Sequence, residues 1–244
     1  MLASPQAQRR LLDLQAVDTA IAQLEHRRKS LPEHAKIAEG QKTRAQLSES
    51  IVAAGTVVGD LELDLQKAEA DLVPVRDRLA RDRQRVDSGA VTDGKQLTAL
   101  VDEIEHLKRR ISDLEDIELE VMEAHENATA EHTRLVAERT EIEDSLRALI
   151  ATRNEQVGVI DADLAQQRAV RDMIAADLPA DLIALYQRIA DRSGGAGVGV
   201  LQGRRCSGCQ LEATASALAE YQAAADDQVV RCEECERILV RGAS

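Results

Sequence analysis

Two long runs of apolar residues share one spacing and lie on either side of a turn-forming stretch. In each run, apolar or small residues recur at steps of three and four, the average spacing of 3.5 that is typical of a coiled-coil seam. The upstream run comprises Ile51, Ala54, Val58, Leu61, Leu65, Ala68, Leu72, Val75, Leu79 and Val86, and Asp82 alone breaks it. The downstream run comprises Leu97, Leu100, Ile104, Leu107, Ile111, Leu114 and Val121. The pattern predicts two long helices that each bury one narrow stripe.

The stretch between the two runs, residues 87–96, predicts a chain reversal. It contains Ser88-Gly89 and Asp93-Gly94, and glycine readily adopts the positive φ that a reversal needs. Asp93, followed by Gln96 three residues later, predicts the cap of the second helix. The two arms are nearly equal in length, which favours one antiparallel hairpin over a parallel dimer of single helices.

The remaining helix signals define a hairpin domain over residues 1–193. A first helix over 5–31 is followed by Pro32, which predicts a kink near 30–33 with Ser30 and Glu33 as a capping box. The ascending helix then runs over about 33–86 with a bend at Pro74. The descending helix is expected over 96–176, and a short helix over 180–192 follows Pro179.

Several polar residues occupy seam positions of the descending helix. They are Glu118, His125, His132, Arg139, Arg153, Gln156 and Asp163. His125 and His132 are seven residues apart on one stripe, which raises the possibility of a metal site or a pH switch. Polar seam positions that fix the register of a long coiled coil are the favoured interpretation.

The composition argues against an enzyme with a deep pocket. The chain has no Trp or Phe, only Tyr186 and Tyr221, and 31% charged residues. Aromatic side chains line most small-molecule pockets, and no nucleophile–base pair is recognisable, so we expect no catalytic activity. The net charge of −13 disfavours phosphate backbones wherever no local basic patch overrides it.

Localisation signals point to a cytoplasmic protein that does not enter membranes. Residues 1–10 lack the apolar core of a signal peptide, and no run approaches 18 apolar residues. All four cysteines lie as two pairs within the last 39 residues, a pattern that suits a reducing compartment.

The two cysteine pairs predict a metal site in a second domain, residues 194–244. Cys206-Ser-Gly-Cys209 and Cys232-Glu-Glu-Cys235 place four thiolates around one tetrahedral Zn²⁺. Four protein ligands close the coordination sphere, so we expect a single structural ion. Two disulfides or a redox dithiol are the alternatives, although a thioredoxin-type βαβ context is missing.

The segments around the cysteines predict a small β-rich ribbon. Glycines crowd the stretch 194–199, which we interpret as a linker followed by a strand with Val198, Val200 and Leu201. Val229-Val230 and Ile238–Val240 are further strand candidates. The Ala-rich segment 211–227 predicts an inserted helix. The apolar residues available to pack it are Leu211, Leu218 and Tyr221.

Five arginines lie close to the cysteines in sequence. They are Arg204, Arg205, Arg231, Arg237 and Arg241. Phosphate binding on a local basic face, donation to the metal thiolates and plain solvent exposure all remain open for them. No aromatic residue accompanies them as a stacking platform for bases.

The chain resembles a bacterial family of coiled-coil hairpin proteins that end in a C4-type zinc ribbon. The matching stretches are GKQLTALVDEIEHLKRRI (94–111), LEDIELEVME (114–123) and the cysteine-bearing tail over 206–241. The resemblance implies Cys206, Cys209, Cys232 and Cys235 as zinc ligands. Relatives include flagellar chaperone-like and type III secretion-associated proteins. Glu236 departs from the family's usual glycine after the last cysteine, and a positive φ there would cost about 1 kcal/mol.

Together these features predict a mainly α protein, with a long antiparallel coiled-coil helical hairpin and a small, β-rich, four-cysteine zinc ribbon at the C-terminus. The expected function is a non-enzymatic, zinc-binding adaptor or chaperone-like protein, acting through the hairpin and the ribbon. A nucleic-acid-binding zinc ribbon is the alternative. The expected partner is a protein of unknown identity, nucleic acid being possible, and self-association of the chain is compatible with the pattern.

Overall fold

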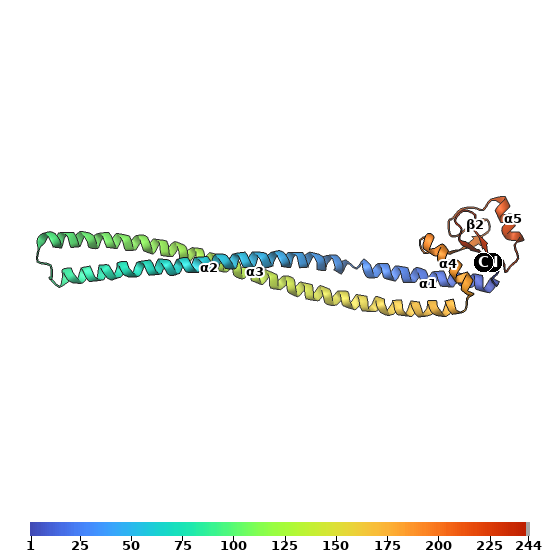
Figure 1. The fold of residues 1–244 in the computed structure, drawn as a ribbon, viewed down its shortest axis with the longest axis horizontal. Helices are drawn as coiled ribbons and strands as arrows, with labels where there is room; N and C mark the ends of the chain where they lie inside the picture. The colour runs from blue at the N-terminus through green and yellow to red at the C-terminus, as the bar shows by residue number, and fades with distance from the viewer. Residues whose placement is uncertain (243–244) are drawn as a thin grey trace. The chain divides into compact units, whose positions relative to one another are not determined.

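The computed structural model describes residues 1–242 and is mainly helical, with a long helical hairpin and a small strand-containing region near the C-terminus (Figure 1). This confirms the predicted fold class. The helices are α1 Pro5–Lys29, α2 Pro32–Asp87, α3 Gly94–Ala176, α4 Ala180–Arg192 and α5 Ala215–Ala223. The strands are β1 Val198–Gln202, β2 Arg205–Cys206, β3 Val230–Arg231 and β4 Ile238–Val240.

The chain divides into two compact units. Unit 1 contains Met1–Ala35 and Ile150–Ser244, and unit 2 contains Lys36–Leu149. Unit 2 is the part of the hairpin in which α2 and α3 run side by side to the turn (Figure 1). Unit 1 holds α1, the end of α3, α4, α5 and the strands. The sequence-based boundary between 193 and 194 stays a prediction.

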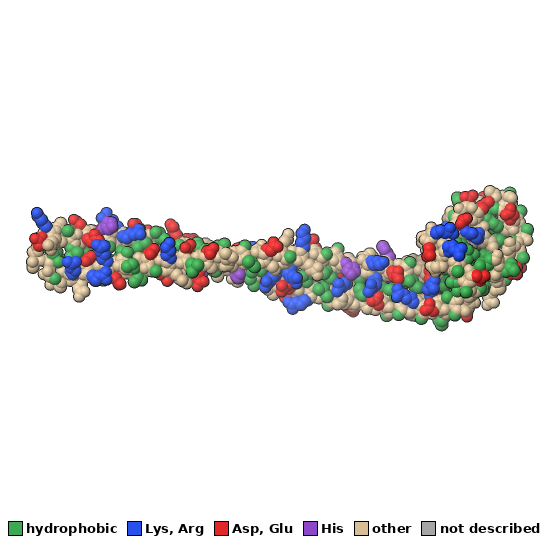
Figure 2. All heavy atoms as spheres, in the orientation of Figure 1, with side chains coloured by type: hydrophobic (Ala, Val, Ile, Leu, Met, Phe, Trp, Pro, Cys, Tyr) green, Lys and Arg blue, Asp and Glu red, His purple; other side chains and the backbone are tan. Residues whose placement is uncertain are grey.

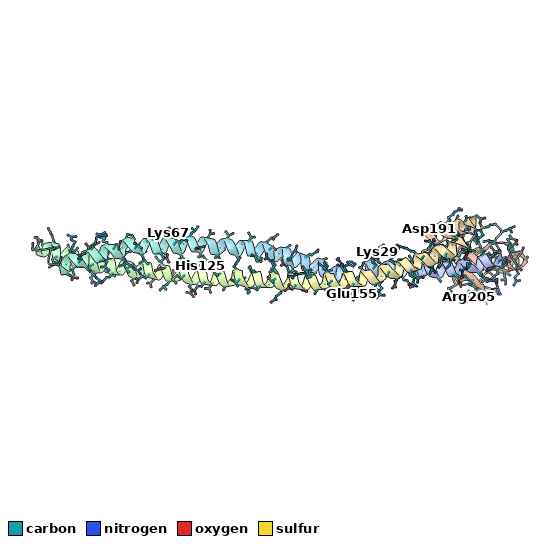
Figure 3. The ribbon with its side chains drawn as sticks, turned by 90° about the horizontal axis from the view of Figure 1, so that it is seen from below. Lys29, Lys67, His125, Glu155, Asp191 and Arg205 are labelled. Carbon is teal, nitrogen blue, oxygen red and sulfur yellow. The ribbon has the colours of Figure 1, made fainter. Side chains whose placement is uncertain are left out.

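In unit 2 the two predicted stripes face each other. Leu79, Ile104 and Leu107 form a buried cluster, against which the half-buried Val75, Val86 and Ile111 pack. All ten apolar positions of the upstream run are buried or half-buried, whereas Leu97 in the downstream run remains 37% exposed beside the turn. The opposite faces of the helices are exposed to solvent, as expected of helices that bury one stripe. Lys67 on α2 and His125 on α3 both belong to this unit (Figure 3).

The turn joining α2 to α3 uses one glycine rather than two. Gly89 has φ +66°, a left-handed conformation that suits glycine, whereas Gly94 begins α3 with ordinary helical geometry. The predicted cap is confirmed, since the Gln96 backbone N–H donates to Asp93 Oδ1 at 2.9 Å.

The prediction that Asp163 occupies a seam position of the descending helix is wrong. Asp163 is exposed, while Leu164 is only 4% exposed and packs with Ile160 and Leu31. The seam advances by four residues at both steps from Gln156 to Ile160 and from Ile160 to Leu164. A straight α-helix drifts relative to a 3.5-residue repeat, and consecutive four-residue steps absorb that drift.

The break between α1 and α2 is built differently from a capping box. Ser30 is the C-terminal cap of α1, and its backbone N–H donates to the His26 carbonyl at 2.9 Å. Glu33 does not return to Ser30. It is buried, and its carboxylate accepts a hydrogen bond from Gln156 on α3 at 3.3 Å. Beyond the break, α2 continues through Pro74, which cannot donate to the Ala70 carbonyl one turn earlier.

Unit 1 contains the larger hydrophobic core. Leu11, Leu14, Leu182, Tyr186 and Ile238 are all completely buried in it, so α1, α4 and β4 share one interior. Gly197 lies so close to Tyr186 that an added Cβ would be 2.6 Å from the ring and 2.7 Å from the Tyr186 carbonyl oxygen. This position of the chain therefore has room for glycine alone.

The four strands form one small sheet in the order β2-β1-β4-β3. The pairs β1–β2 and β3–β4 are antiparallel, and β1 and β4 join the two pairs in parallel. The start of the chain is bound to this region. Ala3 N–H donates to the Asp227 carbonyl at 2.7 Å, and Val229 N–H donates to the Met1 carbonyl at 3.1 Å. Val198 N–H donates to the Gln15 side chain of α1 at 2.8 Å.

Candidate metal centre

Each cysteine pair lies in the same kind of tight backbone turn. In both, the carbonyl of the first cysteine accepts from the N–H four residues later: Gln210 to Cys206 at 2.8 Å and Glu236 to Cys232 at 2.9 Å. The N–H of each first cysteine also donates to the carbonyl five residues on, at 3.0 Å and 2.9 Å respectively. The two turns therefore present their paired sulfurs in equivalent ways.

The residue after each second cysteine takes a left-handed conformation. Gln210 has φ 65° and Glu236 has φ 59°, at positions where a non-glycine residue costs about 1 to 2 kcal/mol. Both are held by side-chain bonds. Arg231 donates to the Glu236 carboxylate at 2.7 Å and to its carbonyl at 3.0 Å, and the Gln210 amide donates to the Ser207 carbonyl at 2.7 Å. Glu236, which stands where the resembled family usually has glycine, thus has a backbone conformation that favours glycine.

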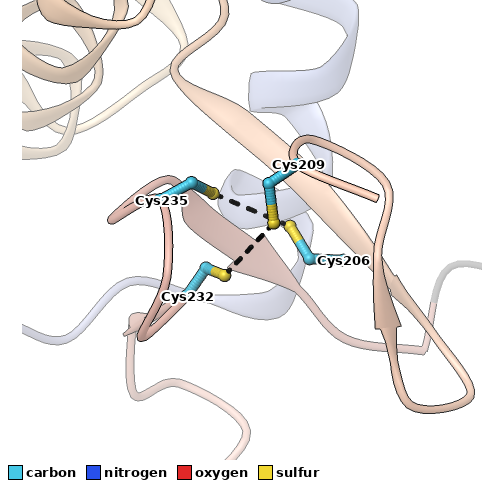
Figure 4. A group of neighbouring side chains, drawn as sticks. All are labelled: Cys206, Cys209, Cys232 and Cys235. Carbon is cyan, nitrogen blue, oxygen red and sulfur yellow. Dashed lines mark hydrogen bonds between the residues drawn. The ribbon is translucent and has the colours of Figure 1, made fainter. Parts of the chain in front are cut away.

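The four sulfur atoms converge on one point (Figure 4), and all lie within 4.8 Å of one another. Cys206 Sγ is 3.9 Å from Cys235 Sγ, and Cys209 Sγ is 3.8 Å from Cys232 Sγ. Four sulfurs about 2.3 Å from a central Zn²⁺ would be about 3.8 Å apart. A disulfide would require about 2.05 Å, and all four cysteines are free. The donor set therefore fits a thiolate-bound metal, zinc by its ligand chemistry.

The protein environment acts on the thiols in different directions. Burial raises the pKa of Cys206 and raises the pKa of Cys232 to about 12. Burial also acts to raise the pKa of Cys235, but hydrogen bonds from the Arg237 backbone N–H and from neighbouring side chains outweigh it, so that pKa is lowered. A metal binds the thiolate form, so occupation of the site displaces protons from these groups.

Helix α5 covers one side of the sulfur cluster. Ala217 and Tyr221 pack with Cys206, Cys232 and Leu239 in a small buried core. The prediction that Leu211 helps to pack this helix is wrong, since Leu211 precedes α5 and is 51% exposed. Ala217 takes that role because α5 begins only at Ala215, after its cap Thr214.

A hydrogen-bond chain that the sequence did not reveal ties α5 to the second cysteine turn. Glu233 lies between the paired cysteines, and its N–H donates to the Tyr221 hydroxyl at 2.9 Å. Its carboxylate accepts from the Thr214 N–H at 2.9 Å and from the Thr214 hydroxyl at 3.3 Å. Thr214 and Glu233 are 19 residues apart, so only the fold brings them together.

Two of the five predicted arginines each bind several backbone carbonyls inside unit 1. Arg237 donates to the carbonyls of Ala196 at 2.8 Å, Gly208 at 3.0 Å and Ser193 at 3.2 Å. Arg241 donates to four carbonyls in the last turn of α5 and the segment that follows it. These belong to Tyr221, Ala224, Ala225 and Gln228, at 2.6 to 3.0 Å. The Arg237 side chain also helps to lower the pKa of Cys235.

The other three arginines are exposed. Arg231 is paired with Glu236 at 2.7 Å, and Arg205 lies 3.6 Å from Glu212. Arg204 is exposed, and its carbonyl accepts from the Ala213 N–H at 2.8 Å. Figure 3 shows Arg205 in the strand-containing part of unit 1. The five side chains thus do not act as one basic face.

Elsewhere in residues 1–242, no second group of three or more His, Cys, Asp or Glu side chains is close enough to hold a metal ion. His125 and His132 are both half-buried, and a role for them in fixing the register of the coiled coil stays a prediction. Among the described helices, none has a stretch apolar enough, over sufficient length, for a bilayer crossing.

Two family models match the chain. Residues 14–194 match the CT398-like coiled coil hairpin domain, and residues 205–239 match the C4-type zinc ribbon domain. An uncharacterized protein of Mycobacterium tuberculosis is 38% identical over 245 residues, which cover 99% of this chain and 98% of that protein.

Solved structures have the same architecture. One from Mycobacterium smegmatis has a TM-score of 0.81 and 36% sequence identity, covering 99% of this chain and 100% of the other. CT398 from Chlamydia trachomatis has a TM-score of 0.68 over 97% of this chain and 98% of that chain. At 19% identity, this second likeness concerns the fold alone.

Proposed function

The chain belongs to the CT398-like coiled coil hairpin family and carries a C4-type zinc ribbon, and from this premise we propose that it is a non-enzymatic, zinc-binding adaptor with a chaperone-like role. Its partner is a protein, bound through the hairpin, the ribbon or both. We propose a cytoplasmic location, because four free cysteines with converging sulfurs suit a reducing compartment.

The observation that carries this proposal is the wide solvent-exposed surface of the two helices in unit 2, beside their narrow buried seam. Its two helices bury one line of residues each and leave their outer faces to solvent. Large apolar side chains remain exposed on these faces, including Val52 at 70%, Leu63 at 64% and Leu119 at 62%. A two-helix surface of this kind supplies contact area for a protein without forming an enclosed substrate pocket.

The chemistry of the cysteine site supports a structural role for the metal. Four thiolates complete a tetrahedral zinc sphere and leave no position for water or substrate. The sulfur cluster also provides much of the interior of its region, where α5 contributes only Ala217 and Tyr221. Metal binding then stabilises the fold instead of activating a reactant.

A nucleic-acid-binding ribbon is the second candidate, and the exposed neighbours Arg204 and Arg205 are the observation that favours it. It has less support than the adaptor proposal. Arg237 and Arg241 donate to backbone carbonyls, and Arg231 is neutralised by Glu236, so few cations are left for phosphates.

Affinity capture from native lysate with the full-length, zinc-loaded chain tests the proposal. We expect specific protein partners, with cross-links that map to α2, α3 or the ribbon. An Arg204→Ala/Arg205→Ala variant should retain the same proteins. If nucleic acid is retained in place of protein, and that variant loses it, the second candidate replaces the first.

A further inference from the structure

An open cavity of about 570 Å³ lies on one flank of the hairpin in unit 2, beside the turn. Three arginines of α2 line it: Arg78, Arg81 and Arg85. Their steps of three and four residues place them on one helix face. The α3 side supplies Gln96, Leu100 and Glu103. We call this cavity the tip groove.

The tip groove has more positive than negative charge. Arg78 is paired with Glu103 at 2.8 Å. Asp82 also lines the groove, and its carboxylate forms long ion pairs with two guanidinium groups, at 3.8 Å from Arg78 and 3.6 Å from Arg85. Arg81 has no ion pair within the described part of the chain. Three guanidinium groups therefore face two carboxylates, in a protein whose net charge is −13.

The exposure of these side chains leaves their donors accessible. The side chains of Arg78 and Arg85 are 57% and 62% exposed, and Arg81 is also exposed. Figure 2 shows Lys and Arg side chains at this end of unit 2, interspersed with acidic ones. A guanidinium group offers a planar fork of donors that matches a carboxylate, and Leu100 adds an apolar wall.

We propose that the tip groove binds an acidic segment of a protein partner, with carboxylates on Arg81 and Arg85 and an apolar side chain against Leu100. This inference rests on the proposed adaptor function and assigns a site to it. The segment is short and rich in Glu or Asp, with apolar residues between the charges.

The groove suits carboxylates on separate side chains better than a continuous phosphate backbone. Asp82 and Glu103 line the same cavity and would repel phosphates that pass them at regular spacing. Unit 2 contains no Phe, Tyr or Trp on which bases could stack, since Tyr186 and Tyr221 belong to unit 1. A flexible peptide can place its charges on the arginines and its apolar residues elsewhere.

Fluorescence anisotropy with full-length protein tests the tip groove directly. The probe is a fluorescein-labelled peptide of Glu-Glu-Leu repeats, compared with a peptide of Gln-Gln-Leu repeats and a uridine oligonucleotide of equal length. We expect binding of the acidic peptide that weakens with added salt, because exposed charges are screened. Arg81→Ala/Arg85→Ala should weaken binding about five- to tenfold, since each exposed contact contributes modestly.

Two matched variants separate a local effect from a general one. Arg44→Ala/Lys67→Ala removes two exposed cations elsewhere on α2 and should leave the affinity unchanged. Glu103→Gln releases Arg78 and removes a repelling carboxylate, so it should tighten binding about two- to fivefold. A gain of this kind does not arise from misfolding.

Failure of the wild-type chain to bind the acidic peptide would overturn the tip proposal. Equal losses in both double variants, or a preference for the oligonucleotide, would do the same. Lysate capture distinguishes this from failure of the adaptor function. If Arg81→Ala/Arg85→Ala retains the wild-type partners, the adaptor proposal stands without the tip groove, and if neither protein retains any, both proposals fail.

Discussion

The hydroxyl of Tyr186 on α4 donates a hydrogen bond of 2.9 Å to the carboxylate of Asp18 on α1. Arg171 on α3 donates to the other oxygen of the same carboxylate at 2.7 Å. One acidic side chain thus joins three helices of unit 1 at the edge of its main core, where Tyr186 is completely buried.

Tyr186→Phe should lower the free energy of unfolding by about 1.5 to 3 kcal/mol. The ring remains, but a hydrogen bond to a charged group is lost. Urea unfolding followed by circular dichroism measures the change. Arg188→Ala, an exposed substitution on the same helix, should stay within about 0.5 kcal/mol of wild type. Equal stability of Tyr186→Phe and wild type would show that the bond contributes nothing.

Stability should also fall at high pH because of the same tyrosine. Burial, and then the hydrogen bond to Asp18, raise the pKa of Tyr186 well above its ordinary value. The phenol in the unfolded chain ionises near pH 10, while the folded protein still holds it neutral. The contribution is therefore complete below about pH 10 and declines as the pH rises above it. Unfolding curves on both sides of pH 10 should show a smaller decline in Tyr186→Phe.

Gly197→Ala and Gly59→Ala should have opposite effects. A Cβ at Gly197 would lie 2.6 Å from the Tyr186 ring, so we expect a loss of about 1 to 3 kcal/mol from overpacking. A Cβ at Gly59 meets nothing within 4 Å in the middle of α2, so alanine should stabilise by up to about 1 kcal/mol. Thermal unfolding measures both, and a harmless Gly197→Ala would contradict the close approach.

Removal of the metal should unfold the cysteine region before the hairpin. We expect one zinc per chain by elemental analysis and its loss in Cys232→Ser, with Ser216→Ala as an exposed control. Chelation should make the backbone amides of residues 206–240 exchange rapidly, while those of the α2 and α3 seam in unit 2 stay protected. Unchanged exchange in metal-free protein would exclude a structural ion.

Arg241→Lys should destabilise the protein, whereas Arg205→Lys should not. Arg241 donates to four backbone carbonyls, and a lysine cannot reproduce that planar fork of donors. We expect a loss of about 1 to 3 kcal/mol for Arg241→Lys and under about 0.5 kcal/mol for Arg205→Lys. Thermal unfolding compares them. Equal effects would mean that the carbonyl contacts are not what holds Arg241 in place.

The periodic features of the chain were the most predictable from sequence. The seam from Ile51 to Val86 follows from spacing alone, because each helix has only one apolar stripe to bury. The Asp93 cap follows from the three-residue spacing between Asp93 and Gln96, because a helix cap depends only on neighbouring residues in the sequence. The cysteine spacing likewise indicated sulfurs that meet, and the structure places them 3.8 to 3.9 Å apart in two pairs.

The features that failed depend on partners distant in sequence. Asp163 and Leu164 exchange roles because helix drift accumulates along α3, which a fixed repeat ignores. Glu33 faces Gln156 across the hairpin instead of capping its own helix. Arg237 and Arg241 donate to backbone carbonyls that lie beside them only in the folded protein. Their positions near the cysteines in the sequence therefore suggested a basic face that does not form.

The antiparallel pairing in unit 2 has a consequence for the order of folding. Gly40 packs against Leu146, so the two chain exits of unit 2 lie side by side once its helices have paired. The segments of unit 1 are separated by more than a hundred residues of chain, and closing so long a loop is slow and entropically costly. Once unit 2 has formed, the ends of the two segments are already close together, so most of this loop-closure cost has been met. Substitutions that weaken the pairing of α2 with α3 in unit 2 should therefore delay refolding of the region that holds the cysteines.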